Sequence, residues 1–287
     1  MWWVRTLEST MENVSDSLYN VESQMTLFWY SYAAWTLGYL LIGIFLSKWS
    51  LTCNSTYLYR VQITESLISS IQGILCGAAG VVVVLNCKHD VMKARHPLAV
   101  TYSSIGSAYF IYDLLAMFYS HGLGLNEKQK QAGFKARMKL YLKANWLMIA
   151  HHVILICLLF PALVYYSNMG DFFTGAFYLT EISTPFVNAR IIISKLGFKE
   201  SKLYVINGVL MMLVFGVFRV YLFPGIYWQY ISQQKGEVLQ ILSRIPVQCH
   251  IYCLILLTPQ LYWWSLMLRG IYHVVIKKVS SPVDKID

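Results

Sequence analysis

The strongest candidates for catalytic residues in this sequence are two adjacent histidines, His151 and His152. They lie in a long apolar stretch, and a neutral imidazole near pH 7 can accept a proton, attack an acyl carbon or bind a metal ion. Neighbouring residues on an α-helix project about 100° apart, so the two rings cannot point at the same spot. We therefore expect one ring to act or bind and the other to orient it.

Further ionisable and amide side chains interrupt other apolar stretches, where such groups are costly unless they face protein, water or substrate. Counting about 1.5 Å per residue from the expected helix ends places several of them at one depth, in the cytosolic third of a membrane. This layer contains Asp113, His151, His152, Asn188 and Gln260. We expect it to form a polar site that is open to the cytosol.

Glu181 and Arg219 fall deeper by the same counting, which predicts an intramembrane ion pair. The pair could serve the site or merely join two helices, because a buried charge needs a partner in either case. Thr184, Pro185 and Asn188 share a helix face with Glu181 through their i+3, i+4 and i+7 spacing. Pro185 also leaves the Glu181 carbonyl without its helical donor, so a kink is expected to open a small polar pocket there.

Other kinds of enzyme site find little support in the sequence. No cysteine or third histidine falls at the depth of the histidine pair, so we expect no metal site. The GxxxxGK, CxxC, HExxH and GxSxG patterns of phosphate-binding, redox, metalloprotease and serine-hydrolase sites do not occur.

Apolar helices must position these residues, because 57% of the chain is hydrophobic, 13% is charged and the mean hydropathy is +0.50. Stretches of about 20 apolar residues, enough to cross a bilayer, predict an all-α, polytopic membrane bundle with about seven transmembrane helices. The predicted spans are 27–46, 61–85, 98–118, 146–166, 172–193, 204–227 and 247–276. The second span has a polar first half, so a six-span bundle stays an alternative.

The charge distribution predicts the orientation of the bundle. Lys and Arg concentrate in alternate loops, above all in 127–143, which favours a lumenal N-terminus and a cytosolic C-terminus. On that topology Asn13 is the expected glycosylation site, and Cys87 and Cys249 lie near lumenal helix ends, where a disulfide is conceivable. The net charge of +9 then reflects topology and contact with anionic lipids rather than nucleic acid, although the basic loop could also guide an anionic acyl-CoA.

Several of these residues lie in short motifs that follow one another in order along the chain. The motifs are residues 109–113 (Tyr-Phe-Ile-Tyr-Asp), 151–152 (His-His), 181–186 (Glu-Ile-Ser-Thr-Pro-Phe), 207–208 (Asn-Gly), Arg219 and 259–263 (Pro-Gln-Leu-Tyr-Trp). Together they resemble the TLC-domain family and are most similar to its TLC domain-containing protein 3 group. The charge distribution and the apolar spans predict a lumenal leader at 1–26, a first transmembrane helix and linker at 27–56 and a cytosolic tail at 279–287. The resemblance implies a six-helix TLC domain at 57–278 between them.

The family includes the ceramide synthases, which join a fatty acyl-CoA to a sphingoid base in the endoplasmic reticulum membrane. By resemblance, His151 and His152 occupy the position of the ceramide synthase histidine pair. Ceramide synthases follow that pair with His-Asp-x-x-Asp on the next helix, whereas this chain has Thr-Glu-Ile-Ser-Thr at 180–184. Only Glu181 could replace a carboxylate there, so the acid–base arrangement is altered or lost.

We therefore expect a multi-pass protein of lipid or sphingolipid metabolism in the endoplasmic reticulum or another secretory-pathway membrane. As an N-acyltransferase of ceramide synthase type it would use acyl-CoA as a co-substrate, need no other cofactor, contact membrane lipids and a sphingoid base, and could form a homodimer. Its expected catalytic residues are His151, His152, Asp113 and Glu181, and its expected substrate-binding residues are Asn188, Gln260, Arg219 and Asn207. The alternative is a non-enzymatic lipid-binding or regulatory protein, and a transporter ranks last.

Overall fold

The apolar stretches fold as helices throughout the part of the chain that the structure, a computed structural model, describes: residues 20–49, 56–159 and 170–279. The first half contains α2 (Val21–Lys48), α4 (Tyr57–Cys87), α5 (Pro97–Leu123), α6 (Glu127–Lys130), α7 (Phe134–Ile154) and the π-helical segment η1 (Leu155–Leu159). The second half contains α9 (Asp171–Leu179), the 3₁₀ segment η2 (Thr180–Ser183), α10 (Thr184–Lys195), α11 (Lys202–Phe215), the π-helical segment η3 (Gly216–Tyr221), α12 (Leu222–Ser232), α13 (Val238–Arg244) and α14 (Val247–Val279). No strand occurs in these residues, so the prediction of an all-α bundle is confirmed.

Five helical segments are both long and apolar enough to cross a membrane: Val21–Lys48, Tyr57–Cys87, Phe134–Cys157, Lys202–Ser232 and Val247–Tyr272. The second of these is α4, the span with the polar first half, and it forms one continuous helix. The other two predicted spans are also helical, but α5 carries several serines and tyrosines, and α9, η2 and α10 are three short pieces. That these two further segments also cross the membrane stays a prediction.

The helix that carries the histidine pair begins earlier than predicted, at Phe134 rather than at residue 146. Its first part is rich in Lys and Arg, so a search for apolar residues could not find it. Asn145 has non-helical backbone angles, with φ −122° and ψ 17°. The kink at Asn145 therefore separates the basic part of α7 from the apolar part, and the predicted start coincides with it. Residues 160–166 of this predicted span lie outside the described residues.

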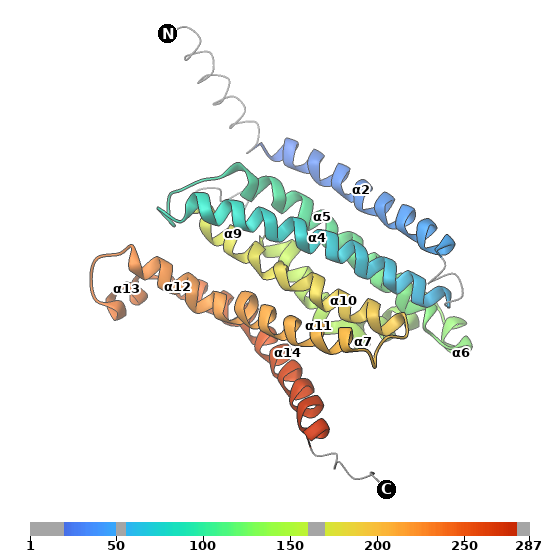
Figure 1. The fold of residues 1–287 in the computed structure, drawn as a ribbon. Helices are drawn as coiled ribbons and strands as arrows, with labels where there is room; N and C mark the ends of the chain where they lie inside the picture. The colour runs from blue at the N-terminus through green and yellow to red at the C-terminus, as the bar shows by residue number, and fades with distance from the viewer. Residues whose placement is uncertain (1–19, 50–55, 160–169, 280–287) are drawn as a thin grey trace.

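The helix α4 lies at the centre of the bundle and packs against α2, α5, α9, η2 and α10 (Figure 1). Glycines on one face of α4 allow the close approach to α9 and η2. A Cβ atom on Gly77 would lie 2.6 Å from Cγ1 of Ile182, and one on Gly80 would lie 2.8 Å from the carbonyl oxygen of Gly175. Small residues at a helix contact let backbones approach closely in membranes, and here they bring η2 next to the centre of the bundle.

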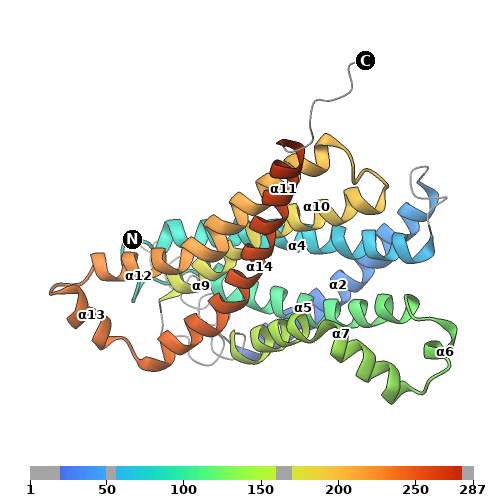
Figure 2. The same cartoon turned by 90° about the horizontal axis from the view of Figure 1, so that it is seen from below.

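The remaining helices close the bundle on its other sides. The helix α7 packs against α5, and α11 packs against both α10 and α14 (Figure 2). On the opposite side of α4, a buried cluster joins α2, α4 and α5 through Trp35, Ile68, Tyr109 and Tyr112. The indole N–H of Trp35 also donates to the Ile105 carbonyl at 3.2 Å. These contacts hold α4 and α5 against each other.

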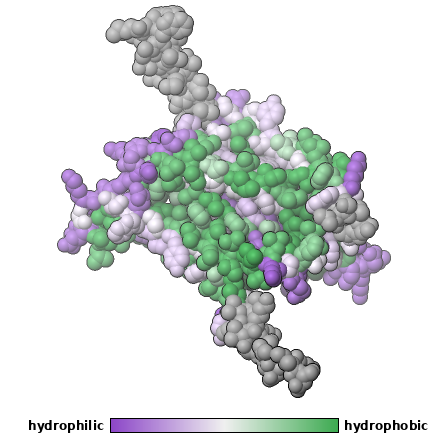
Figure 3. All heavy atoms as spheres, in the orientation of Figure 1, coloured by the Kyte–Doolittle hydropathy of each residue, from purple (hydrophilic) through white to green (hydrophobic). Residues whose placement is uncertain are grey.

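The outer surface is apolar, as a membrane protein requires. Large side chains of α2 such as Leu37, Leu41 and Phe45 are 56–64% exposed. Figure 3 shows hydrophobic residues across the middle of one face, with hydrophilic residues gathered toward the ends of the bundle near α13 and α6. Such a surface is costly in water and favourable in lipid.

Two further predictions concern residues near the chain ends and the loops. Cys87 and Cys249 are both described and both free, so the conceivable disulfide between them is not formed. Asn13, the rest of the predicted leader up to residue 19, and residues 280–287 of the predicted tail lie outside the described residues.

Candidate functional site

Three helices depart from regular α geometry around one cavity. The π-helical segment η1 follows the histidine pair on α7, the 3₁₀ segment η2 contains Glu181, and the π-helical segment η3 contains Arg219. The cavity wall includes Leu155 of η1, Thr180 and Glu181 of η2, and Arg219 of η3. Single π-helical turns within α-helices occur frequently at functional sites, and their convergence here marks the cavity as the candidate site.

Pro185 accounts for the 3₁₀ segment. It has no N–H, so in a regular helix the Glu181 carbonyl would lack a donor. The N–H of Thr184 instead donates to the Glu181 carbonyl, which is the 3₁₀ pattern. The Ser183 hydroxyl donates to the Thr180 carbonyl at 3.3 Å. The Nε–H of Arg219 donates to that carbonyl at 2.9 Å. The predicted break at Pro185 is therefore present, and both carbonyls near it, of Thr180 and of Glu181, have donors.

The predicted Glu181–Arg219 pair is confirmed, with Nη2 of Arg219 3.4 Å from Oε1 of Glu181. The two side chains are only 11% and 13% exposed. Arg219 also donates from Nη2 to the Thr184 hydroxyl at 2.7 Å and from Nε to the Ser183 hydroxyl at 2.8 Å. The Thr184 hydroxyl in turn donates to Oε2 of Glu181 at 2.5 Å. Both oxygens of the carboxylate thus have partners, which is the condition under which a buried charge is tolerated.

The remaining guanidinium nitrogen of Arg219, Nη1, faces α14. Among the described residues its hydrogen-bond partner is Oε1 of Gln260, at the long distance of 3.5 Å. Gln260 is only 6% exposed and follows Pro259 in the helix. Since a terminal guanidinium nitrogen carries two hydrogens, Nη1 is the least engaged donor of Arg219. It can therefore donate to a further acceptor in the cavity.

The two histidines face different surroundings. His151 lines the cavity, and its ring meets the Trp263 ring edge-on, with 6.3 Å between centroids. His152 does not line the cavity; its Nδ1 lies 3.6 Å from Oδ2 of Asp113, and its ring packs 5.2 Å from that of Phe110. A separation of 3.6 Å is too long for a good hydrogen bond, so the His152–Asp113 contact is electrostatic.

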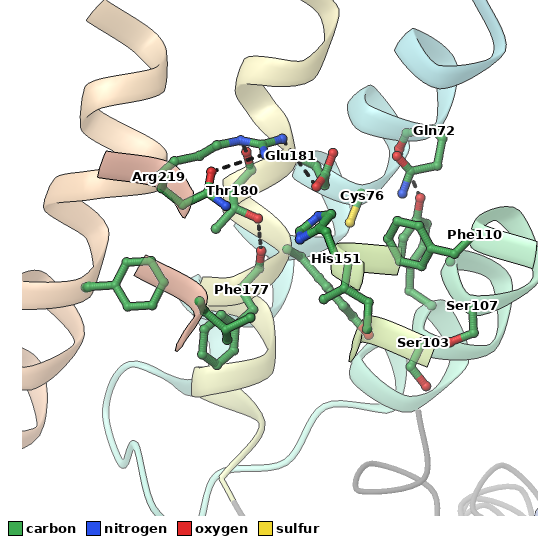
Figure 4. A pocket seen from close by; sticks show the side chains of 17 residues that line it. Gln72, Cys76, Ser103, Ser107, Phe110, His151, Phe177, Thr180, Glu181 and Arg219 are labelled. Carbon is green, nitrogen blue, oxygen red and sulfur yellow. Dashed lines mark hydrogen bonds and ion pairs between the residues drawn. The ribbon is translucent and has the colours of Figure 1, made fainter. Parts of the chain in front are cut away.

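The cavity has a volume of about 80 Å³, which is room for several water molecules. Figure 4 shows His151 near its middle, with Arg219 and Gln72 on opposite sides. Most of the wall is carbon, from side chains such as Phe110, Phe177 and Phe223. A mostly apolar cavity with a few converging polar groups is typical of a small-molecule site.

Four of the predicted site residues line this cavity: His151, Glu181, Arg219 and Gln260. The cavity thus brings two residues of the predicted depth layer, His151 and Gln260, together with the Glu181–Arg219 pair that was expected deeper. Depth counting measures position along each helix and omits rotation about its axis, which decides where a side chain points.

The other four predicted residues lie outside the cavity wall. Asp113 is next to His152, as described above. Asn188 is buried on α10, and its Nδ2 has no hydrogen-bond partner among the described residues. Asn207 donates from Nδ2 to the Phe186 carbonyl at 2.9 Å. This bond joins α11 to α10, so the structure gives Asn207 a packing contact.

The sequence analysis missed the part of the wall that α4 and α5 provide. Gln72, Cys76, Ser103 and Ser107 line the cavity there. The i, i+4 spacing within each pair was a signal that they share a helix face.

The fold and the site define a class: a multi-pass helical membrane protein with a mostly apolar cavity between its helices, lined by a few converging polar groups. A family model described as TLC domain matches residues 62–269. The chain therefore belongs to the TLC-domain family, and the family resemblance inferred from the motifs is confirmed.

The chain is also similar to individual curated proteins. It is 31% identical over 135 residues to TLC domain-containing protein 4-A of Xenopus laevis and to TLC domain-containing protein 4 of Xenopus tropicalis. In each case the match covers 46% of this chain and 51% of the relative, so the chain spans about half the length of the relatives it matches. These relatives do not support the narrower resemblance to the TLC domain-containing protein 3 group. No solved structure matches the chain.

Proposed function

We propose that this protein acts in membrane lipid metabolism by transferring an acyl group within the cavity, with His151 as base or nucleophile. The observation that carries this proposal is the position of His151, which lines the cavity together with the Glu181–Arg219 pair, while His152 is turned to Asp113. An imidazole beside a charged hydrogen-bond donor in a mostly apolar cavity suits acyl transfer. In keeping with the family resemblance, the proposed substrates are a fatty acyl-CoA and a sphingoid base.

The chemistry follows from the groups in the wall. With His151 as base, its ring nitrogen takes a proton from the acceptor amine as the amine nitrogen attacks the thioester carbon. The carbonyl oxygen becomes an oxyanion, which Nη1 of Arg219 can stabilise because its partner Gln260 is 3.5 Å away. Collapse of this intermediate breaks the carbon–sulfur bond, and the imidazolium returns its proton to the thiolate. The products are an amide and the free thiol of coenzyme A.

Glu181 has a positioning role in this mechanism rather than the role of a base. One of its oxygens faces Arg219 and the other accepts the Thr184 hydroxyl. Protonating Glu181 would remove the counter-charge of the buried Arg219, which is unfavourable. We assign Asp113 a similar role toward His152, since the two groups lie together outside the cavity wall. Asp113 and His152 then hold the end of α7 from which His151 projects.

A specific observation also supports the non-enzymatic alternative, a lipid-binding or regulatory protein. Arg219 has acceptors on three elements, namely η2, α10 and α14, so it could serve only to join them. The wall is otherwise mostly apolar and could hold part of a lipid chain without reaction. The histidine variants below separate the two functions.

The test is whether the purified protein forms an amide from palmitoyl-CoA and sphinganine, with the product measured by mass spectrometry. We expect product from the wild type and a loss of at least about a hundredfold in His151→Ala, the range of general acid–base catalysis. His152→Ala should be impaired less. His250→Ala is the matched control, because its ring stacks on Tyr227 outside the cavity wall. Equal product from the wild type and His151→Ala would exclude the mechanism, and no product from folded wild type would favour the lipid-binding alternative.

We further propose that the protein resides in the endoplasmic reticulum or another secretory-pathway membrane, with a lumenal N-terminus and a cytosolic C-terminus. The bias of Lys and Arg toward one set of loops supports this orientation. Protease protection of tags at the two ends, in sealed microsomes, tests it directly.

A further inference from the structure

The side chain of Gln72 lies on α4 in the cavity wall and is 1% exposed. Its Nε2 is buried and has no hydrogen-bond partner among the described residues. A buried amide donor without a partner is unfavourable, and native proteins leave few such groups unless a ligand, an ion or water completes them. Gln72 plays no part in the acyl-transfer steps described above.

No neighbour of Gln72 among the described residues accepts a hydrogen bond from its Nε2. The hydroxyl of Tyr102 donates to the main-chain carbonyl of Gln72 at 3.1 Å, which fixes α4 to α5 but does not involve the side chain. The Ser103 hydroxyl donates to the Val100 carbonyl at 2.8 Å. Cys76 is one turn further along α4, and a thiol is a weak acceptor.

Another buried glutamine shows what a purely structural role looks like in this protein. Gln24 on α2 is 2% exposed, and its Oε1 accepts a hydrogen bond from the Ser104 hydroxyl at 2.6 Å. It does not line the cavity. The two glutamines have the same burial and the same membrane helix environment, but only Gln72 has an open donor and only Gln72 lines the cavity.

We propose that Gln72 is a lipid-recognition residue, whose side-chain N–H donates to an oxygen of the lipid in the cavity. The proposal rests on the proposed function only in taking the ligand to be a lipid. In Figure 4, Gln72 and Arg219 lie on opposite sides of His151, so the cavity has two polar ends with the imidazole between them. Ser107 on α5 lines the wall at the Gln72 end and adds a hydroxyl to it.

This arrangement defines the chemistry of the ligand. An unbranched hydrocarbon chain would leave the Gln72 donor unpaired, whereas a hydroxyl or carbonyl oxygen would complete it. The cavity therefore selects lipids that carry an oxygen at this position, in addition to any group that meets Arg219. A hydroxyl oxygen and a carbonyl oxygen can both accept this hydrogen bond, so the experiment uses separate probes for the two groups.

The experiment compares three probes with the same sixteen-carbon chain: 1-hexadecanol, methyl palmitate and 1-fluorohexadecane, whose fluorine is a poor acceptor. Binding to the purified full chain in lipid nanodiscs is measured for each probe, and the affinity ratio of each oxygen probe to the fluoride is compared between variants. Differences in membrane partitioning cancel in that comparison. We expect a wild-type ratio of about ten, the effect of one hydrogen bond to a buried donor.

Gln72→Met keeps the length of the side chain and removes the donor, so the ratio should fall close to one. Gln72→Leu removes both polar atoms of the side chain and should also lose the preference, which covers the case in which Gln72→Met does not fold. Gln24→Leu is the matched control and should retain the wild-type ratio. A preference for the alcohol alone identifies a hydroxyl oxygen as the ligand group, and a preference for the ester alone identifies a carbonyl.

A wild-type ratio near one, or a ratio that persists in both Gln72 variants, would overturn the proposal. The binding measurement needs no acyl transfer, so it tests the role of Gln72 independently of the proposed acyl-transfer function. His151→Ala should abolish amide formation and retain the Gln72-dependent ratio. A protein that makes no amide but shows this ratio would be a lipid-binding protein with Gln72 as its recognition residue.

Discussion

Arg219 donates its Nε–H to the main-chain carbonyl of Thr180 at 2.9 Å, which joins the π-helical segment η3 to the 3₁₀ segment η2. The acceptor lies in the 3₁₀ segment that precedes Pro185, and the donor lies in the π-helical segment. The bond therefore couples two local departures from α geometry, and it sets the guanidinium beside His151 in the cavity wall.

Replacing Arg219 with Met should destabilise the fold by about 3–5 kcal/mol, because Glu181 would stay buried without a counter-charge. The double variant Arg219→Met with Glu181→Gln should recover part of this loss, since it removes both charges. Thermal unfolding in detergent measures both effects. If the loss of stability in the double variant equalled the sum of the losses in the two single variants, the pair would not be energetically coupled.

Pro185→Ala should restore a donor for the Glu181 carbonyl and allow the Thr184 N–H to return to Thr180. Arg219 would then compete with the Thr184 N–H for its main-chain acceptor, which weakens that hydrogen bond. We expect thermal stability to be maintained or raised, while acyl transfer falls about tenfold through the weakening of one charge-assisted hydrogen bond. Parallel melting and product assays check this. Unchanged product formation would mean that Pro185 does not set the position of Arg219.

Gly80→Ala should destabilise the bundle by about 1–3 kcal/mol or more through overpacking, because its Cβ would lie 2.8 Å from the Gly175 carbonyl oxygen. That neighbour is backbone and cannot move aside alone. Gly43→Ala is the control: no atom lies within 4 Å of its added Cβ, and we expect a gain of about 0.5–1 kcal/mol. Equal melting temperatures for the two variants would contradict the close α4–α9 contact.

Asp113→Asn and His152→Ala should reduce acyl transfer by similar factors, and the double variant should be little worse than either single one. Residues that act as a unit are non-additive in this way. The prediction follows from the 3.6 Å contact between them and from their position outside the cavity wall. Product assays on the three variants measure the coupling, and multiplicative losses would assign the two residues independent roles.

Asn207→Ala tests whether this residue binds substrate or joins helices. Its Nδ2 donates to the Phe186 carbonyl at 2.9 Å, so its removal should cost about 0.5–1.5 kcal/mol of stability through the loss of this hydrogen bond between α11 and α10. The affinity for lipid probes and the rate per folded molecule should be unchanged. A selective loss of lipid affinity at unchanged melting temperature would restore the substrate-binding role expected from the sequence.

The sequence by itself determined that the chain is a helical membrane protein and that Glu181 and Arg219 pair. Both conclusions rest on solvent transfer: long apolar segments are favoured in lipid, and two opposite charges in such segments are tolerated only together. The motifs in order along the chain were also sufficient for the family, which the match over residues 62–269 confirms.

Only the tertiary structure decided which polar residues share the cavity. Spacing along one helix fixes depth and relative direction, but the rotation of each helix in the bundle depends on packing such as the glycine face of α4. That rotation brings Gln72 and His151 into one wall and turns His152 and Asn207 away from it. The segments η1, η2 and η3 shift the register of their helices further, so no count along the sequence could place Arg219 beside His151.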